Sequence, residues 1–406
     1  MESDLYTLQP YAPEPWMASI CKEQLPTTRV ALARLPTPIT PLRPFSSPLV
    51  DAEALAGVEI HLKRDDLTSF DLGGNKVRKL EFLLADALQR GFDSVITIGG
   101  LQSNHCRATA LAARQVGLTP ILILRTELSE EQIDVEGNLM LSRMVGAKIY
   151  TVKPEDYYEK GGDFFVHQLA QRLAETQGRK CYEVPCGGSN TLGTFGYLHA
   201  VAELIRQAGI DSCAPESAPD QDCEGGKRDF PYDHLVFGCG SGGTAAGLAI
   251  GVHLARLDVK VHAVGVCDSP DEFYEVVRHK AESLGLTGQK QEGFVGDFGA
   301  PPLHNDVRRW LSIHDAQGLG YSLSSPEELQ FLYDVSSQTG MVLDPVYSGK
   351  ALFKLCTDLV KSQPEVFRPG HRVLFVHTGG ALGNYAKGDQ LLTLMRADAQ
   401  SLIEPL

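Results

Sequence analysis

The chain has 406 residues, of which 43% are hydrophobic and 22% are charged, as in an ordinary globular protein with a large core. Its formal net charge of −14 at pH 7 argues against non-specific binding to nucleic acid or to anionic membranes. No apolar stretch approaches the length of a membrane span. The nine cysteines are dispersed and include no C-x-x-C pair, which indicates reduced thiols, and we predict no metal site.

The N-terminal region does not resemble a targeting signal. It begins Met-Glu-Ser-Asp, which lacks the apolar segment of a secretory signal and carries acidic residues that transit peptides avoid. We therefore expect a cytoplasmic protein, with a mitochondrial or plastid location left open. Residues 1–28 are rich in proline and polar residues and are expected to form a loose N-terminal extension, followed by an extended lead-in at 29–50.

Strands and helices are expected to alternate over most of the chain. Short apolar runs predict strands at 58–63, 94–98, 120–124, 148–152, 181–185, 233–237, 259–266 and 372–376. Helical spacing of apolar residues predicts helices at 76–88, 106–115, 138–145, 165–175, 196–207, 244–257, 272–284, 326–339 and 348–359. This alternation is typical of a parallel α/β sheet. The polar residues 211–230 interrupt it and predict a surface insertion.

Residues 72–79, Leu-Gly-Gly-Asn-Lys-Val-Arg-Lys, form a basic segment that we call the lysine turn, and the other motifs are interpreted in relation to it. The glycines permit a tight turn, and Asn75 can serve as the N-cap of the helix that follows. Lys76 then lies in the first helical turn with Arg78 and Lys79 close by. Positive charge at a helix N-terminus is suited to an anionic ligand, although a solvated basic turn has the same sequence.

A glycine loop, residues 238–244, connects an expected strand to an expected helix. Glycines allow backbone N–H groups to approach a phosphate at a helix N-terminus. Gly238, Gly240 and Gly243 also fit the G-x-G-x-x-G pattern, and Asp268 follows the next expected strand. The loop therefore also supports an NAD-binding oxidoreductase.

Two further loops carry candidate site residues, the first of them directly after the expected strand at 94–98. Gln102-Ser103-Asn104-His105 opens a helix, where N–H groups can hold a carboxylate, although Ser103 can equally be only an N-cap. Tyr347 and Ser348 follow Asp344 in the second loop, and a lone tyrosine at such a position is often a core residue.

Taken together, these motifs resemble the D-cysteine desulfhydrase and 1-aminocyclopropane-1-carboxylate deaminase family. The resemblance runs from about Leu35 to about Leu392 and includes Gly137-Asn138-Leu139, Gly187-Gly188-Ser189-Asn190 and Gly196-Tyr197. It implies the tryptophan-synthase-β-like fold type II, with two open parallel-sheet domains and pyridoxal 5'-phosphate in the cleft between them. It further implies a large domain of residues 29–78 and 196–406, a small domain of residues 79–195, a small amino-acid substrate and a homodimer.

The resemblance also implies the roles of individual residues. Lys76 binds the cofactor covalently, and neighbouring cations are expected to lower its pKa. Asn104 approaches the cofactor's phenolic oxygen, and Ser348 lies near its pyridine nitrogen. The phosphate is held by Gly240, Ser241, Gly242, Gly243 and Thr244, with Lys79 as extra charge. The substrate is bound by Gln102, Ser103, Asn104, His105, Tyr347 and Thr378. Lys76, Ser103, Tyr347 and Tyr321 are the catalytic residues, and the two tyrosines face the substrate.

The base that removes the α-proton is left open among Lys76, Ser103 and Tyr347. Ser348, Thr378 and His105 match the desulfhydrase branch, whereas the cyclopropane deaminases carry glutamate and leucine at the first two positions. The resemblance thus implies β-elimination of D-cysteine to pyruvate, hydrogen sulfide and ammonia. The alternatives are a cyclopropane deaminase giving 2-oxobutanoate and ammonia, the NAD-binding oxidoreductase, and a cofactor-binding protein without turnover.

Overall fold

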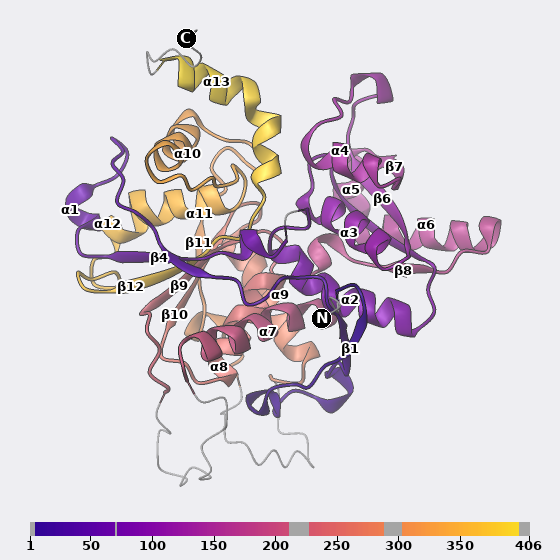
Figure 1. Ribbon diagram of the computed structural model, residues 1–406, viewed down its shortest axis with the longest axis horizontal. Helices are drawn as coiled ribbons and strands as arrows, with labels where there is room; N and C mark the ends of the chain where they lie inside the picture. The colour runs from indigo at the N-terminus through magenta and orange to yellow at the C-terminus, as the bar shows by residue number, and fades with distance from the viewer. Residues whose placement is uncertain (1–4, 70, 211–226, 288–302, 398–406) are drawn as a thin grey trace.

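The computed structural model describes residues 5–69, 71–210, 227–287 and 303–397. These residues form two lobes, each built around its own mainly parallel sheet (Figure 1). The helices are α1 (Ala52–Leu55), α2 (Asn75–Gln89), α3 (Asn104–Gln115), α4 (Gly137–Met144), α5 (Pro154–Lys160), α6 (Gly162–Gln177), α7 (Thr191–Gln207), α8 (Gly243–Leu254), α9 (Pro270–Ser283), α10 (Pro326–Thr339), α11 (Ser348–Lys354), α12 (Val360–Ser362) and α13 (Gly388–Ala397).

The large lobe contains a six-stranded sheet in the order β11-β10-β9-β12-β4-β3. Its strands are β3 (Ile39–Pro41), β4 (Glu59–Lys63), β9 (His234–Cys239), β10 (Lys260–Gly265), β11 (Ser312–Asp315) and β12 (Arg372–Val376), and only β3 is antiparallel to its neighbour. On β9, Leu235 and Phe237 belong to the core beneath α7, α8 and α9, whereas Val236 belongs to the core beneath α10 and α11. Burial on both faces explains why this strand is apolar at successive positions.

The small lobe contains a four-stranded parallel sheet in the order β7-β6-β5-β8. Its strands are β5 (Ser94–Gly100), β6 (Thr119–Arg125), β7 (Lys148–Val152) and β8 (Cys181–Glu183). Val95 of β5 packs with α2 and α3, and Ile96 packs with α6 on the opposite face. Helix α2 also contacts α7 of the large lobe, so the lysine turn at its start lies where the two lobes meet (Figure 1).

The prediction of a loose N-terminal extension is wrong for residues 5–28. Strand β1 (Leu8–Pro10) pairs with β2 (Thr28–Val30), and Trp16, Met17 and Ile20 are buried in the core that contains α7 and α8. The prolines and polar residues of this segment suggest a loose extension, but the apolar residues between them pack on the helices.

The predicted insertion at 211–230 falls largely outside the described residues, but its last four residues are described and belong to the fold. Phe230 is buried in the core of the large lobe, and the backbone N–H of Arg228 donates to Arg256 O at 2.6 Å. The sequence predicts neither a strand nor a helix at 287–325, but the structure has the edge strand β11 there, which pairs in parallel with β10. A strand of only four residues with mixed polarity is too short to show a clear alternation of apolar and polar residues in the sequence.

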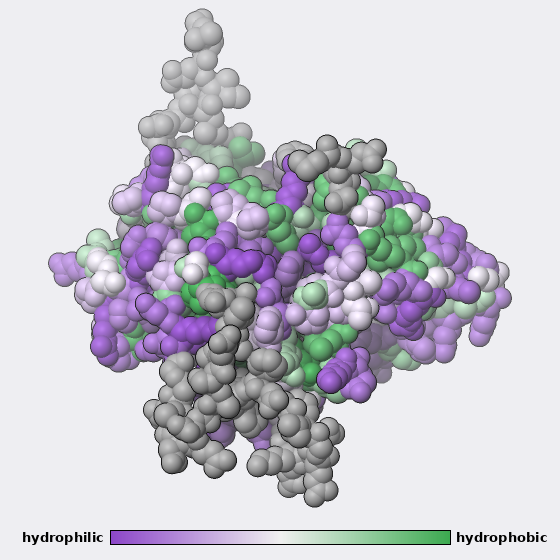
Figure 2. Space-filling model, turned by 60° about the horizontal axis from the view of Figure 1, so that its bottom comes forward, coloured by the Kyte–Doolittle hydropathy of each residue, from purple (hydrophilic) through white to green (hydrophobic). Residues whose placement is uncertain are grey.

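On the face shown in Figure 2, hydrophobic residues form small patches between hydrophilic ones. Within the described ranges, no helix is both long and apolar enough to cross a membrane. The seven cysteines in the described ranges are unpaired, and those ranges hold no group of three side chains suited to a metal ion.

Candidate active site

The lysine turn needs glycine for steric reasons. Gly74 has a φ of +116°, and a Cβ atom there would lie 2.6 Å from Thr378 O. Gly74, rather than the predicted Asn75, is the N-cap of α2. Asn75 is the first helical residue, and its Nδ2 donates to Thr244 Oγ1 at 3.0 Å. The lysine turn is therefore joined directly to the helix that follows the glycine loop.

A pocket brings together most of the predicted site residues. Its lining combines the start of α2, the start of α3, the glycine loop after β9, the start of α11 and the loop after β12: Asn75, Lys76, Asn104, Gly238, Cys239, Gly240, Ser241, Gly242, Thr244, Ala245, Tyr347, Thr378 and Gly379. A more open groove around β6, β7 and α6 contains none of the predicted residues. In parallel sheets, ligands bind at the carboxyl ends of strands, where this pocket lies.

Lys76 has the lowered pKa that was predicted, but for a different reason. Burial lowers the pKa of its amine, whereas the thiols of Cys186, Cys239 and Cys267 act in the opposite direction. Neighbouring cations are not the cause. A lowered pKa makes the amine a better nucleophile and base near neutral pH.

The glycine loop forms a cradle that only glycine residues permit. A Cβ atom at Gly240 would lie 2.5 Å from the Tyr347 ring, and one at Gly242 would collide with Val276. Gly242 also has a φ of +75° and caps α8. The backbone can therefore come close to an anion at the N-terminus of this helix.

Lys79 places a buried amine beside this cradle. Its Nζ donates to Gly187 O at 3.2 Å and would lie 2.9 Å from a Cβ atom at Gly243. Among the described residues, no carboxylate lies within ion-pair distance of Lys79. Burial, followed by the charges of Lys76 and Lys280, lowers its pKa well below the ordinary value. The negative charge of a phosphate group would favour the protonated form of this amine, so the residues present fit pyridoxal phosphate.

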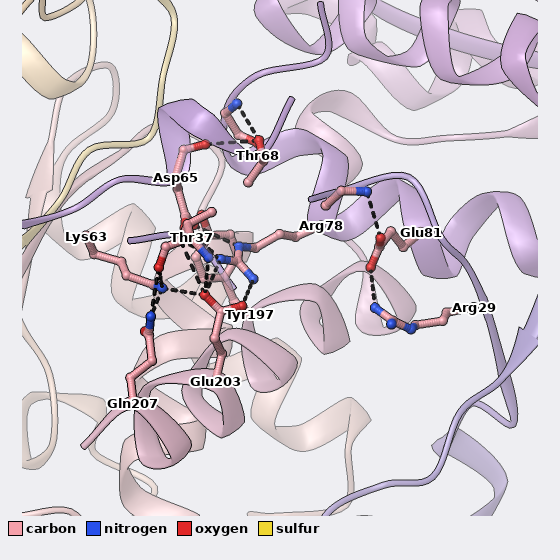
Figure 3. Close-up of polar contacts among 12 residues, drawn as sticks. Arg29, Thr37, Lys63, Asp65, Thr68, Arg78, Glu81, Tyr197, Glu203 and Gln207 are labelled. Carbon is pink, nitrogen blue, oxygen red and sulfur yellow. Dashed lines mark hydrogen bonds and ion pairs between the residues drawn. The ribbon is translucent and has the colours of Figure 1, made fainter. Parts of the chain in front are cut away.

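Arg78 does not serve the anion site, contrary to the prediction. Its guanidinium donates to both oxygens of Asp65 at 2.9 and 2.7 Å and to Glu203 Oε2 at 3.0 Å (Figure 3). Lys63 bonds to Glu203, and Tyr197 donates to Asp65 Oδ2 at 2.7 Å. This buried network ties the first turn of α2 to β4 and α7 (Figure 3).

The predicted substrate loop is only partly directed at the pocket. Asn104 lines it, and Ser103 caps α3 by accepting from Cys106 N at 3.1 Å. Gln102 instead accepts from Asn138 N and donates to Glu136 O. The buried His105 ring bonds to Thr97 Oγ1 at 2.9 Å.

The prediction that the side chains of Gln102 and His105 hold the substrate is therefore withdrawn. Burial, together with the charges of Lys76 and Lys79, keeps the pKa of His105 well below its ordinary value. A neutral ring that does not line the pocket does not form an ion pair with a carboxylate there. The free N–H groups at the start of α3 still can.

Two tyrosines from different segments form a pair at the pocket. Tyr321 and Tyr347 place their hydroxyl oxygens 3.0 Å apart, and Tyr347 lines the pocket. Burial raises the pKa of Tyr321 to about 12 and that of Tyr347 well above 10. Both hydroxyls therefore remain protonated near neutral pH and can donate hydrogen bonds.

Ser348 and Thr378 form a neutral hydroxyl pair. Their oxygens lie 3.1 Å apart, and Thr378 N donates to Ser348 Oγ at 3.2 Å. Ser348 is fully buried at the start of α11, and Thr378 lines the pocket after β12. The nearby Asp344 carboxylate accepts from three backbone N–H groups. The backbone of this loop thus already supplies hydrogen bonds to both oxygens of the Asp344 carboxylate.

Known proteins resemble this chain along nearly its whole length. The family model "Pyridoxal-phosphate dependent enzyme" matches residues 30–379. An Arabidopsis thaliana protein named bifunctional D-cysteine desulfhydrase/1-aminocyclopropane-1-carboxylate deaminase, mitochondrial, is 41% identical over 97% of this chain and 88% of its own. A Serratia proteamaculans D-cysteine desulfhydrase is 34% identical over 82% of this chain and 90% of its own. The crystal structure of an ACC deaminase homologue is 32% identical with a TM-score of 0.70, covering 95% of this chain and all of that one.

The chain therefore belongs to the family of pyridoxal-phosphate-dependent enzymes. The predicted fold type II, with two mainly parallel sheets, is confirmed. Pyridoxal phosphate is the cofactor of this family, so the glycine loop gives no support to an NAD-dependent oxidoreductase.

Proposed function

We propose that this enzyme catalyses the β-elimination of D-cysteine, which consumes water and gives pyruvate, hydrogen sulfide and ammonia. The observation that carries the proposal is the buried hydroxyl pair of Ser348 and Thr378. A serine facing the pyridine nitrogen shares a hydrogen bond with a neutral ring, whereas a glutamate would keep that ring protonated. Elimination of a thiolate needs less electron withdrawal than ring opening, because a thiol has a pKa of about 8.5 and leaves readily.

We assign the proton transfers from the pKa directions. The bound cofactor withdraws electrons from the α-carbon of the amino acid. Lys76 is proposed as the base that removes the α-proton, because burial lowers the pKa of its amine. Tyr347 stays protonated, and the Ser103 hydroxyl is engaged as the cap of α3. Tyr347, supported by Tyr321, is instead suited to donate a hydrogen bond to the sulfur, which leaves as a thiolate.

Further positions follow from the same site. Gly240, Ser241, Gly242, Gly243 and Thr244, with Lys79, are proposed to hold the phosphate. The N–H groups at the start of α3 are proposed to hold the substrate carboxylate. The division into a large domain of residues 29–78 and 196–406 and a small domain of residues 79–195 stays a prediction, as do the homodimer and the cytoplasmic location.

Cyclopropane ring opening is the second candidate activity. The Arabidopsis relative carries both activities in its name, and a solved structure of similar fold is an ACC deaminase homologue. A chain with the hydroxyl pair could therefore still act on aminocyclopropane carboxylate, with 2-oxobutanoate and ammonia as products. We expect this activity to be much the slower of the two.

Exchanging the hydroxyl pair tests the proposal. The double variant Ser348→Glu with Thr378→Leu should release 2-oxobutanoate from aminocyclopropane carboxylate, because the glutamate favours a protonated ring. Its kcat/KM for D-cysteine should fall by at least about 10-fold, the equivalent of one hydrogen bond of about 1.4 kcal/mol. Each single variant serves as a control, since the two hydroxyls are bonded to each other. Unchanged D-cysteine turnover in a cofactor-loaded double variant would show that Ser348 does not face the ring.

A further inference from the structure

Arg107 is a buried cation that the proposed reaction does not use. It lies in the second turn of α3 and is almost completely buried. Its Nε donates to Asn138 Oδ1 at 2.9 Å, and its other nitrogens donate to the carbonyl oxygens of Gly73 in the lysine turn and of Asp71 just before it. No carboxylate lies within ion-pair distance of Arg107 in the part of the chain that the structure describes. The Asp71 carboxylate acts on Arg107 only from beyond ion-pair distance, and the direct contacts of the guanidinium are all with dipoles. A buried charge held in this way is costly, which points to a specific task.

The contacts of Arg107 fix the orientation of the Asn138 side-chain amide, which in turn fixes that of Asn104. A guanidinium has no acceptor, so Asn138 must turn its oxygen toward Arg107 and its nitrogen away. That nitrogen donates to Asn104 Oδ1 at 3.0 Å and to Gln102 O at 3.0 Å. Asn104 must therefore offer its oxygen to Asn138, which leaves its own Nδ2 for the pocket. Within the described ranges, Nδ2 of Asn104 has no hydrogen-bond acceptor, and Asn104 lines the pocket with Lys76.

We propose that Arg107 and Asn138 are positioning residues that hold Asn104 with its amide nitrogen, and not its oxygen, toward the cofactor. Through Asp71 and Gly73, Arg107 also braces the turn that carries Lys76. Arg107 thereby helps to position both Asn104 and Lys76, two of the residues that are proposed to contact the cofactor. This inference rests on cofactor binding at Lys76 and does not depend on which amino acid is the substrate.

The direction of the Asn104 amide has a measurable consequence. An amide N–H stabilises the ionised phenolic oxygen of the lysine-bound cofactor, whereas an amide oxygen repels it. With the cofactor attached to Lys76, a hydrogen bond from Asn104 would matter most when the Lys76 nitrogen carries no proton, because such a proton would compete for the same cofactor oxygen. Turning the Asn104 amide around should therefore raise the pH at the midpoint of the bound cofactor's visible absorbance change. It should also weaken cofactor binding.

Asn138→Asp is the direct test, read on the holoenzyme without substrate. The new carboxylate still accepts from Arg107, so a purely structural contact is kept or strengthened. It cannot donate to Asn104, however, and the Asn104 amide should turn over. We expect the absorbance midpoint to rise by about one pH unit and the dissociation constant of pyridoxal phosphate to increase about 10-fold. A thermal unfolding curve for each variant monitors the fold.

Two controls separate orientation from charge and from folding. Gln102→Glu adds the same charge next to Asn138 and can still accept from its backbone N–H, so it should move the midpoint by less than half as much. Arg107→Lys still only donates, so the amide orientation and the midpoint should stay close to wild type. The proposal is overturned if Asn138→Asp shifts the midpoint no further than Gln102→Glu, or if Arg107→Lys shifts it as far as Asn138→Asp is expected to. A wild-type protein without any visible band would instead contradict the Lys76 assignment.

Discussion

Lys76→Ala should abolish the visible absorbance of the bound cofactor and reduce turnover to the detection limit. The variant loses both the amine that binds the cofactor and the proposed base. Loss of a positioned acid–base group alone costs about 10²–10⁴-fold in rate. The measurement is the absorbance spectrum and kcat of purified protein after addition of pyridoxal phosphate.

Lys79→Ala is the matched comparison for this variant. Lys79 lies one helical turn away beside the phosphate cradle, so its loss should weaken cofactor binding while the visible band survives at saturating cofactor. Lys76→Ala should keep a wild-type circular dichroism spectrum. Cofactor still covalently bound to Lys76→Ala after borohydride reduction would show that another lysine is the attachment site.

Arg78→Met should lower the free energy of unfolding by about 3–5 kcal/mol, the usual cost of removing one partner from a buried ion pair. Asp65 loses its bidentate partner, and Glu203 loses one of its two cationic partners. Because this network anchors the first turn of α2, cofactor loading should also weaken. Urea unfolding of wild type and variant, followed by fluorescence, measures the difference.

Arg90→Met provides a control on the same helix. The Arg90 side chain is 59% exposed in its pair with Asp86, against 1% for Arg78 with Asp65, so its loss should cost only about 0.3–0.5 kcal/mol. Equal effects of the two substitutions would contradict a stabilising role for the buried network.

The same network gives an expected pH dependence. Burial would raise the pKa of Glu203, but the charges and hydrogen bonds of Arg78 and Lys63 outweigh it and lower the pKa to about 2 from an ordinary 4.5. A carboxylate with a lowered pKa stabilises the folded state fully above about pH 4.5, and that contribution is lost as the pH falls toward 2. The difference between wild type and Arg78→Met should therefore shrink over this range.

Much of the fold follows from local patterns in the sequence. The buried strands of both sheets are continuous apolar runs, and β7, β12 and α10 have the predicted bounds. The position of the candidate active site can also be predicted from the sequence, because parallel strands bring the loops at their carboxyl ends to the same edge of the sheet. The strand β11 and the packing of Trp16 depend on distant partners, which a local pattern does not contain.

The roles of the charged side chains were harder to predict, although one signal was available. Arg78 is two residues from Lys76 and so lies on the opposite side of α2, whereas Lys79 is three residues away on the same side. Helical geometry alone could have separated them. The inward orientation of His105 and the contacts of Asn138 and Arg107 could not be read in this way, because they depend on β5 and α4.

The most direct test of the account is a comparison of kcat/KM for D-cysteine, L-cysteine and aminocyclopropane carboxylate with the wild-type holoenzyme. Pyruvate, sulfide and 2-oxobutanoate are each quantified against ammonia. The account predicts that D-cysteine is the best substrate, with pyruvate, sulfide and ammonia released in equal amounts. A larger kcat/KM for aminocyclopropane carboxylate or for L-cysteine would contradict it.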